Sequence, residues 1–429
     1  MRTLENYKYR LSLGVATSVL SLCITGVTTF ETHAQQSAAP RVLPPVSVDA
    51  PRQRTRTTRT VRPRSTAQRA APVVPRQAEQ PATTVGTTRT IGTPAPAYAG
   101  GQVATGGTLG LLGSTNVLNT PFSTVNYTAK LIEDQQARTA ADTLINDASV
   151  RLATGANGYD DTFLVRGFPV DGKDVGFNGL YGLVSTFHVP AQIIERIELL
   201  KGPGALVNGI APANTIGGGI NIVSKRASEV DFNRITPSFI SAGNYGAHLE
   251  TSKRFGANKE WGMRFNGVLR NGEASIKDSN DQLSVGALAL DYRADRFRWT
   301  LDAILQNDDV KNFRPQVSIL TTNPYVPAAP DGRTNWYPGT KLKQRDKTIA
   351  SSVEYDLTNW LTAYAAIGGR KELVEQNLAF SGGVNQFGNF TVTNAYYDQY
   401  INTLTANAGF RSKFDTGELS PKVGDGLIF

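Results

Sequence analysis

Residues 194–227 read "IERIELLKGPGALVNGIAPANTIGGGINIVSKRA", two strand-like phrases separated by a segment rich in glycine and proline. In the first phrase Ile194, Ile197 and Leu199 are interleaved with charged residues, and in "GGGINIVS" isoleucine alternates with small or polar residues. Apolar residues at every second position are typical of β-strands. The stretch has no histidine, no cysteine and no nucleophile spaced from a base, so it predicts an ordered region without catalytic residues.

The turn between the two phrases, "GPGALVNG" at residues 202–209, resembles a phosphate-binding loop only superficially. It lacks the closing Gly-Lys-Ser/Thr and does not match G-x-G-x-x-G. Nucleotide binding is therefore not expected. We expect its glycines to form tight turns that need a positive φ angle.

The composition argues against several classes of site. The chain has 429 residues, with one cysteine, Cys23, and three scattered histidines, His33, His188 and His248. A single cysteine cannot form a disulfide within the chain, and the histidines predict no metal site. No acid–base constellation is present either. We expect no catalytic residue, no metal and no cofactor, so the chain is not predicted to be an enzyme.

The basic charge lies in one segment. Residues 51–100 contain nine arginines and one glutamate, which equals the net charge of +8 of the whole chain. Most of these arginines lie in "PRQRTRTTRTVRPRSTAQRAAPVVPRQ", which has low complexity and no aromatic residue. A nucleic-acid surface would spread basic residues over folded elements with aromatics among them. No nucleic-acid partner is expected.

The N-terminus predicts export. A cationic start, "MRTLENYKYR", precedes an apolar stretch at residues 11–30, and "ETHAQQ" follows. This order is that of a secretory signal peptide, cut after Ala34, so residues 1–34 are expected to be removed. A membrane-spanning helix is the alternative, since about 20 apolar residues suffice, but seven serines and threonines in the stretch argue against it.

Residues 35–108 are expected to hold a short strand and a linker. In "LPPVSVDAP", Val46, Val48 and Ala50 alternate with Ser47 and Asp49. A peptide this short could add as an extra strand to the edge of another protein's sheet, and a plain disordered tail is the alternative. The residues that follow are rich in Pro, Thr, Arg, Ala and Gly, so they predict an extended disordered tether.

Residues 109–228 predict a small mixed α/β domain. We expect a strand near residues 122–127, short helices near 129–135 and 140–146, and a capping box between Thr139 and Asp142. Further strands are expected in "FLVRGF", "IERIELL" and "GGGINIVSK".

Residues 229–429 predict an all-β region. In "RFRWTLDAILQ" Phe297, Trp299 and Leu301 share one face, and Arg298, Thr300 and Asp302 share the other. The phrases "LTANAGFRSKF" and "ASSVEYDLT" repeat the alternation. An apolar face opposite a charged face, in runs near ten residues, is typical of a membrane β-barrel. A soluble sandwich is the alternative. The segment 307–346, rich in Pro, Asn and Thr, predicts an extracellular loop.

The phrases "FLVRGF", "IERIELLKGPGALVNG" and "GGGINIVSKR", in this order, together with "TPFSTVNYTAKLIEDQQARTAADTL", resemble the plug domain of TonB-dependent outer-membrane receptors, in the ferric-siderophore branch. The resemblance covers residues 109–228. It implies an α+β plug followed by an antiparallel transmembrane β-barrel of 22 strands, in the outer membrane of a Gram-negative bacterium.

The resemblance also implies partners and a mechanism. Pro45, Val46, Ser47, Val48, Asp49 and Ala50 match the TonB box of the family in place and character. The implied partners are TonB with its inner-membrane energising complex, a ferric siderophore and outer-membrane lipid. In the family the ligand binds from outside, TonB pairs with the box and pulls, and the ligand passes with its iron still chelated.

The resemblance implies site residues as well. Arg166 matches a plug arginine that faces the ligand pocket in relatives, although pairing with a barrel carboxylate is an equal alternative. Tyr181 is expected in an apical loop, and Asn208 stands where many relatives carry a ligand-contacting tyrosine. These three are the expected ligand-binding residues. Plug–barrel ion pairs are expected of four others: Glu195, Arg196, Glu198 and Lys201.

The barrel region is too short for 22 strands. We count roughly eight or nine, and an eight-stranded barrel has an interior that side chains fill, so it cannot enclose a plug. The final "PKVGDGLIF" also lacks a strand's alternation. We therefore expect a C-terminally truncated chain. The alternatives to siderophore uptake are a non-transporting or pseudogene fragment, or another cargo such as haem or cobalamin.

Overall fold

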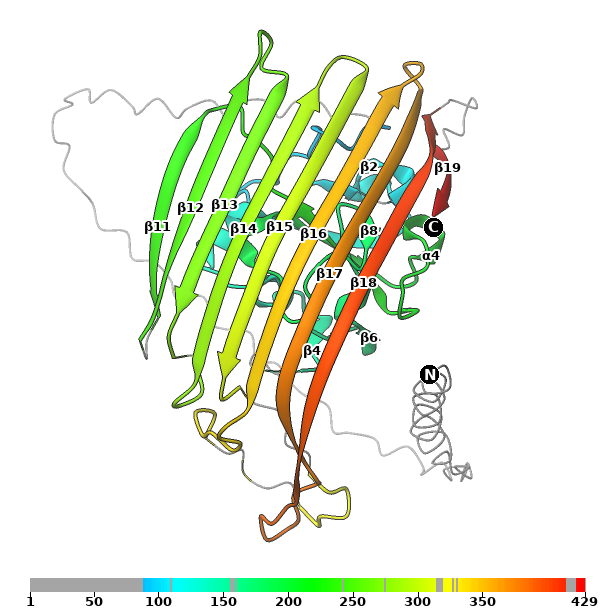
Figure 1. Ribbon diagram of the computed structural model, residues 1–429. Coiled ribbons are helices and arrows are strands. Elements are labelled where there is room, and N and C mark those ends of the chain that lie inside the picture. Colours follow the sequence, from blue (N-terminus) through cyan, green and yellow to red (C-terminus); the bar gives the residue numbers. More distant parts are fainter. Residues whose placement is uncertain are drawn as a thin grey trace, which may run out of the picture. The chain divides into compact units, whose positions relative to one another are not determined.

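The computed structural model describes residues 88–108, 110–154, 158, 160–240, 243–273, 275–313, 319–325, 328, 331–413 and 422–428. All of them lie in one compact unit, residues 79–429. The expected signal peptide and the Pro45–Ala50 box lie outside the described residues. In Figure 1 the unit is a broad antiparallel sheet with smaller, mixed elements packed on one of its faces.

The smaller elements form the expected α/β domain. In chain order they are β1 (Gly106–Thr108), η1 (Gly110–Leu112), β2 (Ser114–Asn116), η2 (Val117–Asn119), β3 (Ser123–Thr128), α2 (Ala129–Asp134), α3 (Ala140–Leu144), β4 (Val150–Leu152), β5 (Phe163–Val165), β6 (Phe168–Val170), η3 (Gly172–Asp174), β7 (Val175–Phe177), β8 (Leu180–Tyr181), η4 (Ala191–Ile193), β9 (Ile194–Lys201), α4 (Ala205–Asn208) and β10 (Gly218–Ser224).

The capping box at α3 is present. The Thr139 hydroxyl accepts a hydrogen bond from the Asp142 amide, and the Asp142 carboxylate accepts one from the Thr139 amide. Each bond satisfies an amide that a helix start would otherwise leave without a partner. The helix buries Ala140, Ala141 and Leu144.

The stretch that opened the sequence forms the centre of this domain. β9 and β10 pair antiparallel within a five-stranded sheet of order β3-β9-β10-β7-β8, in which β10 and β7 run parallel. The expected glycine turns are present, with φ of 108° at Gly202 and 78° at Gly209. At Gly218 a Cβ atom would lie 2.3 Å from the Leu200 carbonyl oxygen, so only glycine allows the two strands to pair this closely.

The core of the domain lies against this sheet. Ile194, Ile197 and Leu199 of β9 and Ile222 of β10 are fully buried, and Ile220 is 2% exposed. Each such side chain contributes about 1.5–3 kcal/mol by leaving water. The same buried cluster includes Val268, Leu283, Val285, Ala287 and Ala350 of the larger sheet, so the domain and the sheet share one apolar core.

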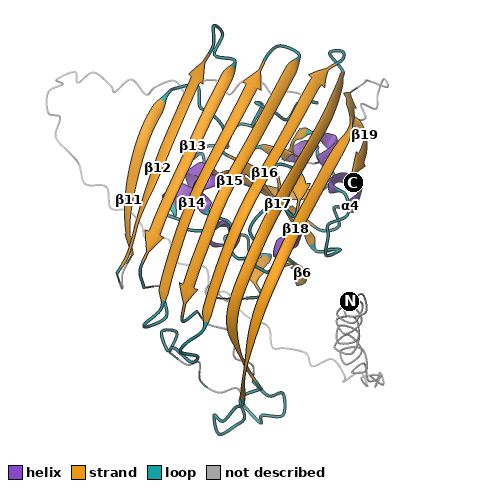
Figure 2. Cartoon of the chain, viewed as in Figure 1, coloured by secondary structure: helices purple, strands orange, loops and turns teal. Residues whose placement is uncertain are grey.

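The larger sheet has nine strands, each antiparallel to its neighbours in chain order. They are β11 (Phe232–Ile240), β12 (Asn244–Phe255), β13 (Trp261–Asn271), β14 (Asn280–Arg293), β15 (Phe297–Lys311), β16 (Lys341–Asp356), β17 (Leu361–Ser381), β18 (Val392–Lys413) and β19 (Lys422–Ile428). Figure 2 shows them as one continuous layer. β11 and β19 are its edges, so the sheet is open.

The two faces of the sheet differ as the alternation predicts. On β15, Arg298, Thr300 and Asp302 are 3–4% exposed and face the α/β domain, whereas Leu305 is 56% exposed on the opposite face. The outward face continues with exposed aliphatic side chains on neighbouring strands: Leu249, Leu269, Ile349, Ile367 and Leu404. Such a face suits lipid, and a polar face suits a hydrated interior.

The two ends of the sheet also differ. Turns at residues 256–260, 294–296 and 357–360 are short, and at the other end residues 312–340 and 382–391 form long connections. Aromatic rings gather at the short-turn end. Trp261 lies with its ring centre 6.3 Å from that of Phe255, 4.7 Å from Tyr292 and 6.3 Å from Trp299. A band of aromatic rings there is typical of a membrane–water interface.

Three expectations need correction. The linker was expected to extend to residue 108, but the chain makes specific contacts from Thr88 onward, because backbone groups there find partners on β16. The expected loop at 307–346 is shorter, since β15 extends to Lys311 and β16 begins at Lys341. The final segment forms strand β19 despite its lack of alternation, because the free edge of β18 supplies backbone hydrogen-bond partners whatever the side chains are.

Within the described residues no helix is both long and apolar enough to cross a membrane.

Truncation of the core at Ile197 tests how the α/β domain is stabilised. Ile197→Ala leaves a cavity in the centre of β9, and we expect it to lower the free energy of unfolding by about 2–5 kcal/mol. Urea-induced loss of protease resistance of this domain measures the effect. Leu206→Ala is the matched control, since Leu206 is 84% exposed. Equal midpoints for the two variants would contradict this account of the core.

Candidate functional site

Besides the shared apolar core, charged and polar side chains hold the α/β domain to the larger sheet. Lys225 follows β10, and its Nζ lies 2.7 Å from the Glu250 carboxylate on β12, which also binds Arg264 at 2.7 Å. Glu250 is 1% exposed. A buried carboxylate must be paired, so the inner face of the sheet requires the cation from the domain.

A second contact is centred on Asp302 of β15. Its carboxylate lies 2.6 Å from Nη2 of Arg226, accepts the Ser224 hydroxyl at 2.8 Å and accepts the Asn178 side-chain amide at 3.1 Å. All three partners belong to the α/β domain. A third contact joins Arg138 to Asp281 of β14 at 2.7 Å.

The segment 183–188 of the domain makes polar contacts with another part of the sheet. The Thr186 hydroxyl donates to Glu372 of β17 at 2.7 Å, and the Gln344 amide of β16 donates to the Ser185 hydroxyl at 3.0 Å. Gln306 of β15 donates to the His188 carbonyl at 3.0 Å. These bonds tie the segment to three consecutive strands.

Phe187, in the same segment, makes an apolar contact. It is buried in a small cluster at the long-loop end of the sheet, with Val310, Phe313, Leu342 and Leu378. This cluster joins the α/β domain to the residues that begin and end the 312–340 loop.

The expected ion pairs at Glu195, Arg196, Glu198 and Lys201 are not formed with the sheet in the described residues. Arg196 lies 3.9 Å from Glu198, and Lys201 lies 2.9 Å from Asp147, so both pairs stay inside the domain. The Glu198 carboxylate also accepts hydrogen bonds from the Thr108 amide and the Asn221 side-chain amide, both within the domain. Arg196 instead donates to the carbonyls of Ala95 and Gly106.

The residues that dock the domain to the sheet were missed from sequence. Lys225 and Arg226 stand in "VSKRA", directly after the second strand phrase, and Asp302 is the acidic residue on the polar face of the best alternating strand. A cationic pair at the end of one domain and a carboxylate on the inner face of the next is the signal that could have found them.

The three expected ligand-binding residues lie in two places. Arg166 is exposed at the turn between β5 and β6, with φ of 53°, and its Nη1 donates to the Lys201 carbonyl at 3.3 Å. Tyr181 and Asn208 line a different, small cavity of about 40 Å³. Arg166 does not line that cavity, so the structure brings together two of the three residues.

Two ionisable groups near these residues have shifted pKa values. Burial, with a smaller contribution from Asp174, raises the pKa of Tyr181 to about 12, so its hydroxyl stays protonated. Burial, together with Asp171, raises the pKa of Asp160 to about 6. Tyr181 can therefore donate a hydrogen bond at neutral pH but cannot act as an anion.

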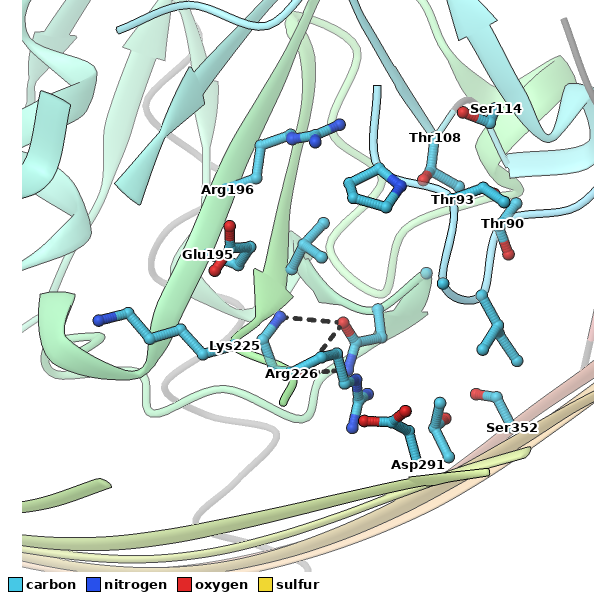
Figure 3. A pocket seen from close by; sticks show the side chains of 18 of the residues that line it. Thr90, Thr93, Thr108, Ser114, Glu195, Arg196, Lys225, Arg226, Asp291 and Ser352 are labelled. Atoms are coloured by element: carbon cyan, nitrogen blue, oxygen red, sulfur yellow. Dashed lines mark hydrogen bonds between the residues drawn. The ribbon is translucent and has the colours of Figure 1, made fainter. Parts of the chain in front are cut away.

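A larger cavity of about 760 Å³ lies between the domain, the larger sheet and the chain at residues 90–94. Figure 3 shows Arg196 and Lys225 on one side of it and Thr90 and Thr93 on the other. Glu195, Glu198, Arg226 and Asp291 also line it. Its lining combines these charged side chains with apolar ones such as Ile91, Val223 and Val353, which suits a solute that has both polar and apolar parts.

No group of three or more His, Cys, Asp or Glu side chains suited to a metal ion occurs among the described residues. The protein offers hydrogen-bond donors, cations and aromatic rings at these cavities. Such groups can recognise a polar or anionic ligand.

Comparison with known proteins identifies the class. Residues 116–218 match the family model of the TonB-dependent receptor plug domain. This match covers β9 and the Gly-rich turn, and the sheet that follows has the polar inner face on which such a plug packs. The chain belongs to the TonB-dependent receptors, whose members are receptors and transporters and not enzymes, and it is located in the outer membrane of a Gram-negative bacterium.

Several relatives are named as receptors for ferric siderophores, and one is named as a vitamin B12 transporter. The chain is 33% identical over 333 residues to the ferrichrome receptor of Yersinia enterocolitica, covering 77% of this chain and 44% of that one. It is 24% identical to the ferrichrome outer membrane transporter/phage receptor of Escherichia coli, over 78% and 48% of the two chains. The crystal structure of the ferric preacinetobactin receptor of Acinetobacter baumannii superposes with a TM-score of 0.72 at 34% identity, over 75% and 48%. The chain thus spans about half the length of these relatives.

Removal of the Asp302 carboxylate tests the docking of the plug. The Asp302 side chain is 3% exposed and pairs with Arg226. Asp302→Ala removes this buried carboxylate and leaves Arg226 without its partner. Breaking a buried pair in this way costs about 3–5 kcal/mol. We expect faster protease cleavage of the plug in outer membranes, with the β-sheet intact. Asp295→Ala, in an exposed turn, is the control. Unchanged cleavage of the Asp302 variant would refute a docking role.

The His188–Asp161 pair predicts a pH dependence. Burial lowers the His188 pKa, but the Asp161 carboxylate, 2.9 Å from Nδ1, more than offsets this, so that pKa lies above its usual value. Asp281 and Asp308 on the sheet act in the same direction. The resulting stabilisation is fully present below the usual histidine pKa of about 6.5 and is lost as pH rises through the higher pKa of the folded protein.

We therefore expect the plug to become more sensitive to urea as pH rises from about 6 to about 9. Protease resistance measured across this range reports the change. His188→Gln should flatten the profile, since glutamine does not titrate. A variant with the same pH dependence as the unmodified protein would show that another group is responsible.

Proposed function

We propose that the protein is a TonB-dependent receptor that takes up a ferric siderophore through the outer membrane. The observation that carries the proposal is a plug domain docked by buried ion pairs on the polar inner face of an antiparallel sheet whose outer face is apolar. This arrangement serves a plug that closes a barrel and can be displaced from it.

The names of several relatives support a ferric siderophore as the cargo. Two are named for ferrichrome, and the matched crystal structure is that of a ferric preacinetobactin receptor. The Arg166 guanidinium and the Tyr181 hydroxyl can donate hydrogen bonds to the carbonyl or anionic oxygens of an iron chelate. The iron remains within its chelator, so no His or Cys ligand is required from the protein.

The energy for uptake is proposed to come from TonB. Pro45–Ala50 would pair with TonB as an added strand, in which backbone hydrogen bonds supply the affinity. The linker that follows would carry the pull to the plug. Outer-membrane lipid would cover the exposed aliphatic side chains of the sheet.

Uptake of radiolabelled ferric chelates tests the proposal. The protein is expressed in a Gram-negative host that lacks its own ferric-chelate receptors, and ferrichrome, ferric preacinetobactin, haem and cobalamin are compared. We expect uptake of one ferric siderophore that is abolished in a host without TonB. Val48→Pro, which removes a backbone donor from the box, should have the same effect, and Ser37→Pro outside the box should not.

The other outcomes separate the alternatives. Uptake of haem or cobalamin alone would assign a different cargo to the same scaffold. Binding or uptake of none of the four by a chain that reaches the outer membrane would support the non-transporting alternative and contradict the proposal.

A further inference from the structure

The short segment that precedes the plug, Thr88–Thr93, here called the strap, is bound to the larger sheet. The Glu354 carboxylate of β16 accepts the Thr90 amide at 3.0 Å and the Ile91 amide at 3.2 Å. Arg89 lies 2.6 Å from Asp356, and the Thr88 and Thr362 hydroxyl oxygens are 2.8 Å apart. These bonds use the backbone of the strap as well as its side chains.

The binding site for the strap is rigid and buried. Glu354 is 2% exposed and Asp356 is 4% exposed. Arg298 donates to both oxygens of Asp356, at 2.6 and 2.9 Å, and Arg411 donates to Glu354 at 2.7 Å. The Arg411 guanidinium also lies 3.9 Å from the centre of the Tyr364 ring. Two arginines therefore orient two carboxylates before the strap is added.

The Glu354 carboxylate can accept more hydrogen bonds than the two arginines donate to it, and the strap donates further ones. A carboxylate can accept about four hydrogen bonds, and two arginines use only part of the capacity of Glu354. The consecutive amides of Thr90 and Ile91 use more of it. Charge-assisted bonds of this kind are about twice as strong as bonds between neutral groups.

The strap has a conformation that requires glycine. Gly92 has φ of 77°, in the left-handed region, and a Cβ atom there would lie 2.9 Å from Nε of Arg293. The Thr93 hydroxyl donates to the Arg89 carbonyl at 3.3 Å and closes the turn. The segment is thus a defined turn fitted to the sheet.

The strap stands between the linker and the plug in the path of a pulling force. The contacts of the strap with other parts of the protein, as given above, all go to the sheet. The chain enters the plug only after the strap, where Arg196 donates a hydrogen bond to the Ala95 carbonyl at 3.1 Å. A force applied upstream is therefore carried first by the contacts of the strap with Glu354, Asp356 and Thr362. The plug core is loaded only when these contacts open.

The strap also forms one side of the 760 Å³ cavity, which Thr90, Ile91, Gly92 and Thr93 line opposite plug residues such as Lys225. Its binding site flanks the short turn at residues 357–360. Ligand pockets commonly measure about 300–1,000 Å³. Displacement of the strap would remove the side of the cavity nearest the short-turn end while the buried ion pairs of the plug remain in place.

We propose that the site formed by Arg298, Glu354, Asp356, Thr362 and Arg411 is a docking site for the strap, and that release of the strap is the first step of an energised transport cycle. The docking part rests only on the contacts above. The transport part rests on the proposed function. Release opens the cavity toward the short-turn end before the plug itself moves.

The docking is tested on the purified protein in detergent, without TonB or cargo. Hydrogen exchange of a peptide covering residues 88–95 is measured by mass spectrometry. We expect exchange at least tenfold faster in Glu354→Gln, because a neutral amide accepts more weakly from the strap and from both arginines. Asp309→Asn, a carboxylate on the outward face of β15, is the matched control and should leave exchange unchanged.

Gly92→Ala tests the same docking by a substitution in the strap, with every residue of the sheet unchanged. Its methyl group meets Arg293 and opposes the left-handed φ, so we expect equally fast exchange of the strap and unchanged exchange of β16 and β17. Exchange as slow as in the unmodified protein in both variants would refute docking of the strap, whatever the protein transports.

Release is tested by a reversible crosslink. In Thr88→Cys/Thr362→Cys the new sulfur atoms replace hydroxyl oxygens that lie 2.8 Å apart. We expect the oxidised variant to bind the ferric chelate normally but to lose at least nine-tenths of its uptake, and reductant to restore it. Each single cysteine variant, treated identically, controls for oxidation by itself, and its uptake should not differ between the oxidised and the reduced sample.

The outcomes separate the docking of the strap from its release during transport. Normal uptake by the fully crosslinked protein would overturn release of the strap as a required step. Absence of uptake in the unmodified protein would contradict the proposed function, and the hydrogen-exchange result would still decide whether the strap is docked.

Discussion

The structure depends on the pairing of ionised side chains that are buried on the inner face of the sheet. Glu250, Asp302 and Glu354 are 1–3% exposed, and a charge removed from water without a partner is strongly destabilising. The sheet supplies some partners itself, such as Arg264 for Glu250. The plug and the strap supply the others. The inner face is therefore complete only when both are docked.

The plug and the sheet also share an apolar core. Ile194, Ile197 and Ile222 of the plug lie in one buried cluster with Val268 and Val285 of the sheet. A polar contact can exchange its bonds for bonds to water when two bodies separate, whereas an apolar contact exposes its surface to water. Separation of the plug from the sheet therefore costs hydrophobic as well as ionic stabilisation.

The contacts between the plug, the strap and the sheet are unevenly distributed. Phe187 of the plug packs in an apolar cluster beside the residues where the 312–340 loop begins and ends. Lys225 and Arg226 of the plug instead form ion pairs with carboxylates of β12 and β15. At the short-turn end the strap interacts with Glu354 by its backbone amides. The long-loop end and the short-turn end of the sheet are thus joined to the rest of the protein by different kinds of contact. In the proposed transport cycle, a force on the linker would reach the hydrogen-bonded strap before the apolar cluster.

The sequence alone was sufficient for the elements that depend on local pattern. The alternation from Phe297 to Gln306 determined which face of β15 is polar, and Thr139 with Asp142 determined the start of α3, because both follow from residues close together in the chain. The motifs around β9 identified the family. Only the tertiary structure decided the partners of charged residues, since Lys201 pairs with Asp147 and Arg226 with Asp302 across many intervening residues. It also decided that Thr88–Thr93 is bound to the sheet, because this Thr-rich segment has no periodicity and its contacts go to side chains of β16 and β17.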